Sequence, residues 1–233
     1  MRYVLIPGAG GSAWYWSRVV PLLKSAGADA VAVELPADDD SADLFAYAEL
    51  VRAAAADATA PVVMVAQSMG AFTAPLAAGL VPTARIVLVN PMVPRPGESA
   101  GQWWAATGQK QAMLANFRRI GLGDKEFDSV EDFFHDVPAD IREEAFSKPE
   151  PPQSDTPFEQ PWPLDAWPDV PTRYLVCRHD RFFPATFARA MARERLGIEP
   201  DEIDGSHCVY LSRPGELAGR LEAYAAQRAL SSG

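Results

Sequence analysis

The 233-residue sequence contains few cysteines and no long hydrophobic run. Its two cysteines, Cys177 and Cys208, are too few for the disulfide framework of a small secreted domain, and they lack the paired spacing of a zinc site. A membrane-spanning helix would need about 18 contiguous apolar residues, which are absent, and the apolar run before Pro7 is too short for a secretory signal. These absences predict a soluble, cytoplasmic protein.

Positive charge is also scarce, because 21 lysines and arginines stand against 31 aspartates and glutamates and leave a net charge of −10. A surface of this sign repels phosphate backbones and anionic lipids, so we expect neither nucleic acid nor a membrane as a partner. Hydrophobic residues make up 48% and charged residues 22% of the chain, a balance that excludes a disordered or collagen-like protein. The sequence has no internal repeat, which excludes a solenoid or a propeller.

Short apolar runs rich in β-branched residues alternate with longer segments of helical periodicity. Buried strands are predicted at residues 3–6, 30–35, 62–66, 86–89 and 174–177, with a short sixth strand near 202–203. Helices are predicted over residues 43–56, 69–80, 184–196 and 213–230. This alternation is typical of an α/β fold in which helices cover both faces of a mainly parallel sheet of about six strands.

Residues 91–170 interrupt the alternation, since they contain no clear strand and many aromatic side chains. The segment is far longer than an ordinary connection, and its aromatic residues favour burial. We therefore expect a helical cap at 91–170, inserted between two parts of an α/β core, residues 1–90 and 171–233. Many prolines near the end of this segment suit an extended return to the sheet.

The segment from Val62 to Gly70 is the strongest indication of chemistry. The pattern Ser-x-Gly occurs four times, but only Ser68 stands where a buried strand ends and a helix of small residues begins. Such a turn exposes the serine hydroxyl and directs the N-terminus of a helix toward it. Ser68 is therefore predicted to be a nucleophile rather than a simple helix cap.

With this turn the sequence resembles the α/β-hydrolase superfamily, whose nucleophile lies in a Gly-x-Ser-x-Gly elbow. Ala66 replaces the first glycine, and we expect strand and helix to accommodate its methyl group. The resemblance extends from residue 3 to 221 and is closest to the branch of methylesterases and hydroxynitrile lyases, through residues 8–16, 91–104 and 205–213. It implies the α/β-hydrolase fold, and we expect neither a cofactor nor a bound metal.

A serine nucleophile needs a base, which an acid orients in turn. Of the three histidines, His135 lies in the predicted cap and His179 lies beside an acidic residue, whereas His207 lies in the loop where the resemblance places the base. Asp180 follows the predicted strand at 174–177. Some relatives carry the acid at the end of the strand before it, but that position holds Asn90 here, which lacks a carboxylate. The chain order of serine, acid and histidine then matches the superfamily.

The resemblance also implies two backbone N–H groups that stabilise an oxyanion. One belongs to Met69, the residue after the nucleophile, and the other to Ala9 in the glycine-rich loop after the first strand. Gly8 and Gly10 would allow a close approach of the backbone there. Pro7 stands where many relatives have histidine.

The same loop also fits a dinucleotide-binding pattern. Residues 8–13 match G-x-G-x-x-G/A after a strand, and Glu34 ends the next strand. Against this interpretation, the bulky residues 14–16 stand where a phosphate-binding helix would begin, and the Tyr-x-x-x-Lys pair of short-chain reductases is absent. A dinucleotide-binding oxidoreductase is kept as a minor alternative.

The sequence predicts a serine hydrolase that cleaves an apolar carboxylic ester or lactone through an acyl-enzyme on Ser68. In the resembling hydroxynitrile lyases a lysine follows the catalytic histidine and a hydroxyl stands at the position of Gly8, whereas this chain has Cys208 and glycine. Both departures disfavour cyanohydrin cleavage. Lyase, cyclase or cofactor-free oxygenase chemistry on the same scaffold, or ligand binding without turnover, stays open.

Candidate substrate-binding residues follow strand ends or lie in the predicted cap. They are Gly8, Trp14, Trp16, Phe72, Met92, Trp103 and Trp104. Their character favours an apolar acyl or alcohol group, and core packing is the alternative role for each side chain. If Trp103 and Trp104 are exposed, they could instead mark a contact between two copies of the chain in a homodimer.

Overall fold

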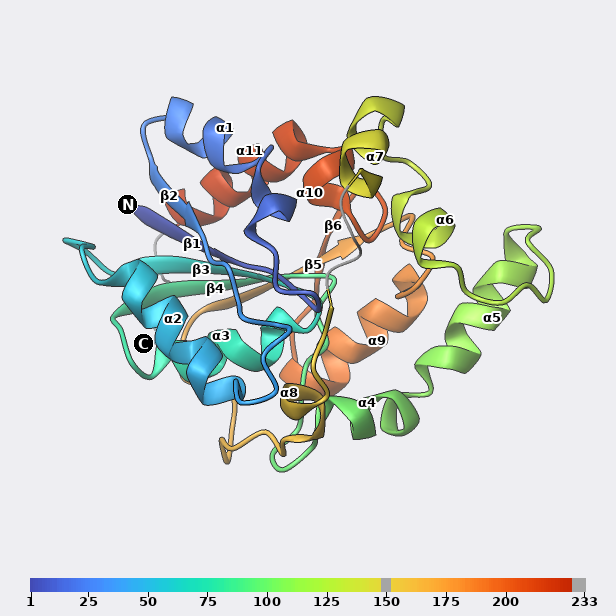
Figure 1. The fold of residues 1–233 in the computed structure, drawn as a ribbon, viewed down its shortest axis with the longest axis horizontal. Helices are drawn as coiled ribbons and strands as arrows, with labels where there is room; N and C mark the ends of the chain where they lie inside the picture. Colours follow the sequence, from blue (N-terminus) through green and yellow to red (C-terminus); the bar gives the residue numbers. More distant parts are fainter. Residues whose placement is uncertain (148–151, 228–233) are drawn as a thin grey trace.

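A computed structural model describes residues 1–147 and 152–227 of the chain (Figure 1). Its centre is a six-stranded parallel sheet with the strand order β2-β1-β3-β4-β5-β6. The strands are β1 (Arg2–Ile6), β2 (Asp29–Ala32), β3 (Val62–Gln67), β4 (Thr83–Val89), β5 (Thr172–Cys177) and β6 (Asp201–Ile203). The predicted α/β class and the predicted number of strands are confirmed.

The bounds of the predicted strands differ most from the structure in β2 and β4, by three residues at one end of each. β2 ends at Ala32 rather than at residue 35, because Leu35 leaves the sheet and its N–H donates to the carbonyl of Gly11 at 2.9 Å. β4 begins at Thr83 rather than at residue 86, because the polar start of this strand is already paired with β3. Both differences arise from pairing with another segment.

Helices cover both faces of the sheet (Figure 1). On one face lie α2 (Leu44–Ala55), α3 (Gly70–Ala78) and α9 (Ala185–Leu196), and on the other η1 (Ala13–Trp16), α1 (Val20–Ser25), α10 (Val209–Ser212) and α11 (Pro214–Ala226). The predicted helices are thus present, and η1, α1 and α10 are additional. The predicted extension of α11 to residue 230 lies in part outside the described residues. Within the described residues, no helix combines the length and the apolar character that crossing a bilayer requires.

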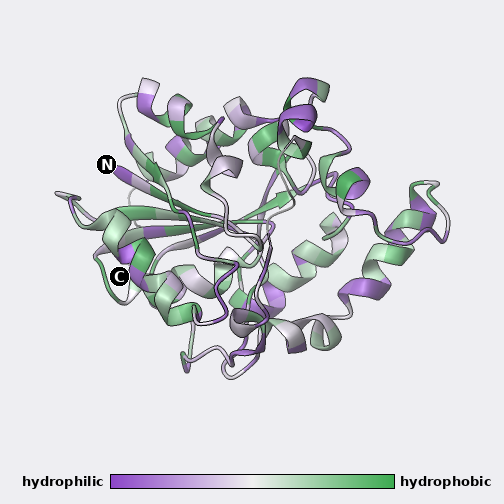
Figure 2. Ribbon diagram, viewed as in Figure 1, coloured by the Kyte–Doolittle hydropathy of each residue, from purple (hydrophilic) through white to green (hydrophobic). Residues whose placement is uncertain are grey.

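The alternation of side chains along the strands creates two cores. In β1, Val4 and Ile6 point to the core beneath α2 and α3, whereas Tyr3 and Leu5 point to the core beneath α1 and α11. The strands are accordingly apolar along most of their length, and most of the helices combine hydrophobic and hydrophilic stretches (Figure 2). A sheet buried on both faces explains why its strands read as continuous apolar runs.

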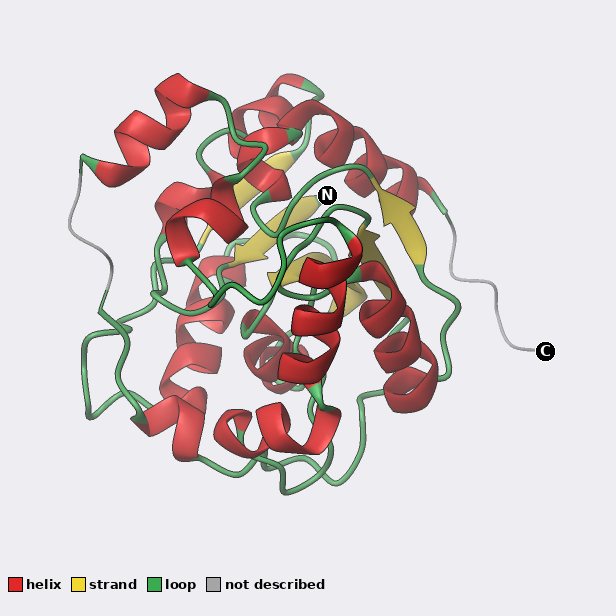
Figure 3. Ribbon diagram, turned by 90° about the vertical axis from the view of Figure 1, so that its right-hand side faces the viewer, coloured by secondary structure: helices red, strands yellow, loops and turns green. Residues whose placement is uncertain are grey.

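The segment between β4 and β5 is helical. It contains α4 (Ala100–Thr107), α5 (Gln109–Arg119), α6 (Ser129–Phe134), α7 (Ala139–Phe146) and α8 (Thr156–Glu159), and its described residues form no strand. These helices add to the layers that surround the central strands (Figure 3). Trp103 and Trp162, from the two ends of the segment, are buried in the core on the α3 side. Much of the segment is therefore continuous with the core, and its division into a separate cap stays a prediction.

Candidate active site

Ser68 occupies the sharp turn between β3 and α3. Its φ angle of +50° lies in the left-handed region, which residues with a side chain seldom adopt. Its N–H donates to the carbonyl of Val89 at 3.2 Å, and its own carbonyl accepts from the N–H of Met92 at 2.9 Å. The end of β4 thus holds the strained turn on both sides, in the conformation that a nucleophile elbow requires.

Two glycines let the loop after β1 approach this turn. A Cβ at Gly70 would lie 2.7 Å from the carbonyl oxygen of Pro7, and a Cβ at Gly8 would lie 2.9 Å from the Cβ of Ser68. Neither position has room for a methyl group. Ala66, where relatives have a third glycine, is fully buried, and the core accommodates its methyl group.

Asp180 and His207 are directly bonded, although 27 residues separate them. Oδ2 of Asp180 lies 2.7 Å from Nδ1 of His207, and both side chains are buried. Oδ1 of Asp180 accepts from the backbone N–H groups of Phe182 and Phe183 at 2.8 and 3.0 Å. A carboxylate can only accept hydrogen bonds, so Nδ1 of the neutral imidazole carries the proton and donates a hydrogen bond to Asp180. The other ring nitrogen, Nε2, then has the single lone pair of the ring.

Two residues that sequence reasoning missed hold the histidine loop. The N–H of Ser206 donates to Asp136 at 3.0 Å, and the carbonyl of Ser206 accepts from the amide of Asn90 at 3.5 Å. Asn90 also accepts from the N–H of Cys177 at 2.8 Å, so it joins β4, β5 and the loop. The place of Asn90 at a strand end could have indicated this role, whereas nothing in the local sequence marks Asp136.

Gln67, immediately before the nucleophile, was also missed. Its amide nitrogen lies 2.9 Å from Nε2 of His207, and both residues are buried. Because the other ring nitrogen carries the proton, the Gln67 amide donates to the lone pair of Nε2. Within residues 1–147 and 152–227, the hydroxyl of Ser68 makes no hydrogen bond to His207. The structure thus brings the acid and the histidine together beside the serine, and Gln67 occupies the lone pair that the serine would use.

Aromatic rings surround the imidazole of His207. Phe133 of α6 stacks on it with ring centroids 4.6 Å apart, and Phe182 and Phe183 contact it edge-on at 5.6 and 5.2 Å. Trp104 of α4 packs in turn on Phe182. The segment between β4 and β5 therefore covers the histidine and keeps it away from bulk water.

The remaining histidines and the neighbouring cysteine have other environments. The ring of His135 bonds to the carbonyl of His179 at 2.9 Å, and burial lowers the pKa of His135. His179 is exposed and lies 3.3 Å from Asp204. Burial raises the pKa of the Cys208 thiol, which keeps it protonated and unreactive. None of these side chains takes the place of His207.

The two predicted oxyanion donors flank the nucleophile. Met69 follows Ser68 at the start of α3, and Ala9 follows Gly8, which lies against Ser68. In the part of the chain that the structure describes, the N–H groups of Met69 and Ala9 donate to no protein acceptor. Unpaired N–H groups beside a serine are what a developing oxyanion needs.

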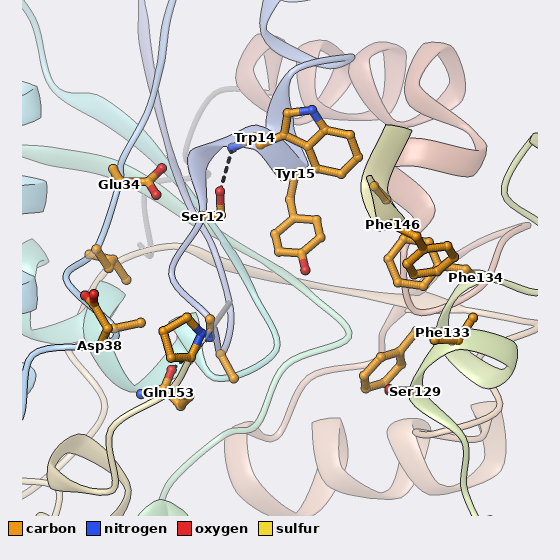
Figure 4. Close-up of a pocket in the computed structure, with 17 residues that line it drawn as sticks. Ser12, Trp14, Tyr15, Glu34, Asp38, Ser129, Phe133, Phe134, Phe146 and Gln153 are labelled. Atoms are coloured by element: carbon orange, nitrogen blue, oxygen red, sulfur yellow. Dashed lines mark hydrogen bonds between the residues drawn. The ribbon is translucent and has the colours of Figure 1, made fainter. Parts of the chain in front are cut away.

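A cavity of about 580 Å³ opens beside this site, between the loop after β1 and helices α6 and α7 (Figure 4). Ala9 and Phe133 belong to its wall, so it adjoins both a predicted oxyanion donor and the ring stacked on His207. Its aromatic lining is Trp14, Tyr15, Phe133, Phe134 and Phe146, and its polar lining is Ser12, Glu34, Asp38, Ser129 and Gln153. Within the described residues, carboxylates are the only charged groups that line it.

The candidate binding residues divide between this cavity and the core. Trp14 lines the cavity, and its indole N–H donates to Glu144 at 2.8 Å. Trp104 contacts the cluster over the histidine through Phe182. Four others are fully or almost fully buried and do not line the cavity, because η1, α3, α4 and the segment after β4 pack into the core: Trp16, Phe72, Met92 and Trp103. Gly8 lies against Ser68 in the loop after β1. The buried Trp103 therefore presents no surface to a second copy of the chain.

Two backbone N–H groups of the glycine-rich loop that could bind a dinucleotide phosphate already have acceptors within the protein. The N–H of Gly10 donates to Gln153 at 2.9 Å, and the N–H of Ala13 donates to Glu34 at 2.6 Å. The loop leads into the short 3₁₀ helix η1 instead of a long phosphate-binding α-helix. Among the described residues, no group of three histidine, cysteine or acidic side chains is arranged to bind a metal.

Comparison with solved structures supports the fold. Polyneuridine aldehyde esterase superposes with a TM-score of 0.77 at 21% identity, covering 96% of this chain and 98% of that one. A pyrethroid hydrolase from Sphingobium faniae JZ-2 superposes with a TM-score of 0.72 at 20% identity, covering 97% of each chain. A methylesterase from Arabidopsis superposes with a TM-score of 0.74 at 16% identity, covering 97% of this chain and 99% of that one. These structures agree with the branch that the sequence resembles.

No curated protein matches the sequence. The model of the alpha/beta hydrolase family, however, matches residues 3–220, which is nearly the whole chain. It agrees with the six-stranded parallel sheet that helices cover on both faces. The chain therefore belongs to the alpha/beta hydrolase family.

Proposed function

We propose that the protein is a carboxylic ester hydrolase that forms an acyl-enzyme on Ser68. The observation that carries the proposal is the buried pair of Asp180 and His207, bonded at 2.7 Å beside a serine on a strained strand-to-helix turn. Each feature alone has a structural explanation. Their combination at the carboxyl edge of one parallel sheet supports nucleophilic catalysis.

The reaction would proceed in two halves. Nε2 of His207 takes the proton of the Ser68 hydroxyl while Oγ attacks the carbonyl carbon of the ester, and the N–H groups of Met69 and Ala9 bind the oxyanion. Asp180 stabilises the imidazolium, which then protonates the departing alcohol and leaves an acyl-enzyme. Water attacks this acyl group and gives a proton to His207, which returns it to Ser68 Oγ as the carboxylic acid departs.

For the substrate we propose a small apolar ester or lactone. The cavity beside Ala9 has an aromatic wall, which favours an apolar acyl or alcohol group. Glu34 and Asp38 on its polar side would repel an anionic substrate. The cytoplasmic location, the lack of nucleic acid or membrane partners and the homodimer remain predictions.

The test combines covalent labelling with turnover. A fluorophosphonate probe should label Ser68, as mapped by mass spectrometry, and a panel of short and medium acyl esters should be hydrolysed. Ser68→Ala should lose labelling and about 10⁶-fold in kcat. Hydrolysis in ¹⁸O-water should place one heavy oxygen in the acid product, whereas a lyase or cyclase would place none there. Absence of both labelling and turnover would contradict the proposed function.

A further inference from the structure

We propose that Gln67 is a positioning residue that competes with Ser68 for the single lone pair of the catalytic histidine, and so keeps the base away from the nucleophile in the free enzyme. The inference rests on the proposed function, since it concerns the same serine and histidine. It assigns a role to a side chain that the mechanism above does not use.

The competition follows from the chemistry of the imidazole ring. Nδ1 of His207 donates to Asp180, so the ring has one remaining acceptor, Nε2, and that atom has one lone pair. The amide nitrogen of Gln67 lies 2.9 Å from Nε2 and donates to it. A neutral Nε2 cannot take the proton of Ser68 while a second donor occupies its lone pair.

The backbone of Gln67 is fixed in the sheet, whereas its amide lies in space that Gly8 leaves free. Gln67 ends β3, is paired with Val89 of β4, and has 4% of its surface exposed. A Cβ at Gly8 would lie 2.6 Å from Oε1 of Gln67, so the absence of a side chain at residue 8 leaves the space that the amide oxygen uses. The glycine loop therefore shapes the contact with the histidine as well as the approach to the nucleophile.

The histidine is less free to move than its partner. Asp180 binds one nitrogen of the ring, and Phe133 and Phe183 pack on its face and edge. The contact between Gln67 and His207 must therefore open on the glutamine side when the serine approaches Nε2. After proton transfer Nε2 becomes a donor, and the amide can accept from it through Oε1 once it has rotated.

The experiment removes the competing donor in two ways. Gln67→Met keeps the length of the side chain without a hydrogen bond, and Gln67→Asn keeps the amide but is too short to reach Nε2. Each variant should react with the fluorophosphonate at Ser68 about fivefold faster than the wild type, the factor that corresponds to one hydrogen bond of about 1 kcal/mol. Gln111→Met, at an exposed position on α5, is the matched control and should leave the rate unchanged.

A spectroscopic readout separates this role from a merely structural one. The chain has three histidines, so the two-bond ¹⁵N spectrum of the imidazoles can be assigned by single substitutions. In Gln67→Met the Nε2 signal of His207 should move away from its wild-type position, because the donor to its lone pair changes, while the signals of His135 and His179 stay in place. An unmoved signal would overturn the contact.

The failures of the two proposals are distinguishable. If the wild type is labelled at Ser68 and both folded variants react at the same rate or more slowly, the competition is wrong and the hydrolase stands. If no variant and no wild type is labelled at Ser68, the proposed function fails and the competition fails with it. Thermal unfolding of each variant shows that the comparison is made between folded proteins.

Discussion

The nucleophile turn and the histidine loop lie at the same edge of the sheet, yet the chain stabilises them by different means. Ser68 is held by backbone hydrogen bonds to Val89 and Met92 at the end of the adjacent strand, and by glycines that let the loop after β1 come close. The imidazole of His207 is held by side chains, from Asp180, Gln67 and Phe133. We therefore expect the nucleophile turn to be disturbed by substitutions that add a methyl group. The histidine loop should instead be disturbed by substitutions that remove a polar side chain.

After loss of the nucleophile itself, the largest expected effect concerns the acid. Asp180→Asn keeps an oxygen for the N–H groups of Phe182 and Phe183 but presents an amide to Nδ1 of His207, which favours the wrong tautomer. We expect kcat for ester hydrolysis to fall by about 10⁴-fold, by analogy with other triads. Steady-state kinetics on a neutral ester, with circular dichroism as the folding control, measures this. A loss below tenfold would contradict the role of the acid.

The nucleophile turn should be sensitive to a single methyl group. Gly70→Ala would place a Cβ 2.7 Å from the carbonyl oxygen of Pro7, which belongs to the backbone and has little room to shift. We expect the free energy of unfolding to fall by about 2 kcal/mol in urea titrations. Gly219→Ala is the matched control, because it lies within α11 with no atom near the added methyl group, and it should raise the free energy of unfolding by about 0.5 to 1 kcal/mol. Equal effects of the two substitutions would refute the contrast.

The histidine loop should instead respond to the loss of Asp136. This carboxylate accepts from the N–H of Ser206 at 3.0 Å, and a hydrogen bond to a charged group is stronger than a neutral one. Asp136→Ala should lower kcat about tenfold with little change in KM, and Asp136→Asn should restore part of the loss. Glu143→Ala, at an exposed site on α7, is the control. A change confined to KM would show that the residue acts on substrate binding instead.

The smallest effect concerns the charge of the cavity. Glu34 and Asp38 line it, so an ester with an anionic acyl group should be a poorer substrate than its neutral isostere. In the double variant Glu34→Gln and Asp38→Asn, the ratio of kcat/KM for the neutral to the anionic ester should fall about threefold. Glu49→Gln combined with Glu199→Gln, both in exposed ion pairs away from the cavity, controls for the loss of two negative charges. An unchanged ratio would show that the acyl group does not bind near Glu34 and Asp38.

The two parts of the site also differ in how well they could be predicted from the sequence. The turn at Ser68 was predictable because its evidence is contiguous, a buried strand followed by a helix of small residues. The partners Asp180 and His207 needed the resemblance to a known family, since their contact spans 27 residues. Gln67, Asn90 and Asp136 were missed as partners of the histidine, because a side-chain contact across the sheet edge leaves no periodic signal.

The core shows the same division between local and distant information. Apolar runs with β-branched residues identified five of the six strands, because a sheet covered on both faces needs such runs. The start of β4 at Thr83 and the end of β2 at Ala32 were misplaced, because pairing with a neighbouring strand or loop decided them. Trp16 and Trp103 were candidates for binding a substrate, and the packing of η1 and α4 put both into the core.

The sequence by itself determined the α/β class, the succession of the strands along the chain, and the turn that carries Ser68, since each depends on residues close together in the chain. Tertiary structure alone decided that Gln67 occupies the lone pair of His207, that Phe133 covers the ring, and which tryptophans line the cavity. The physical reason is that side-chain hydrogen bonds and ring stacking depend on where distant segments meet, and only the packed sheet and helices bring those segments together.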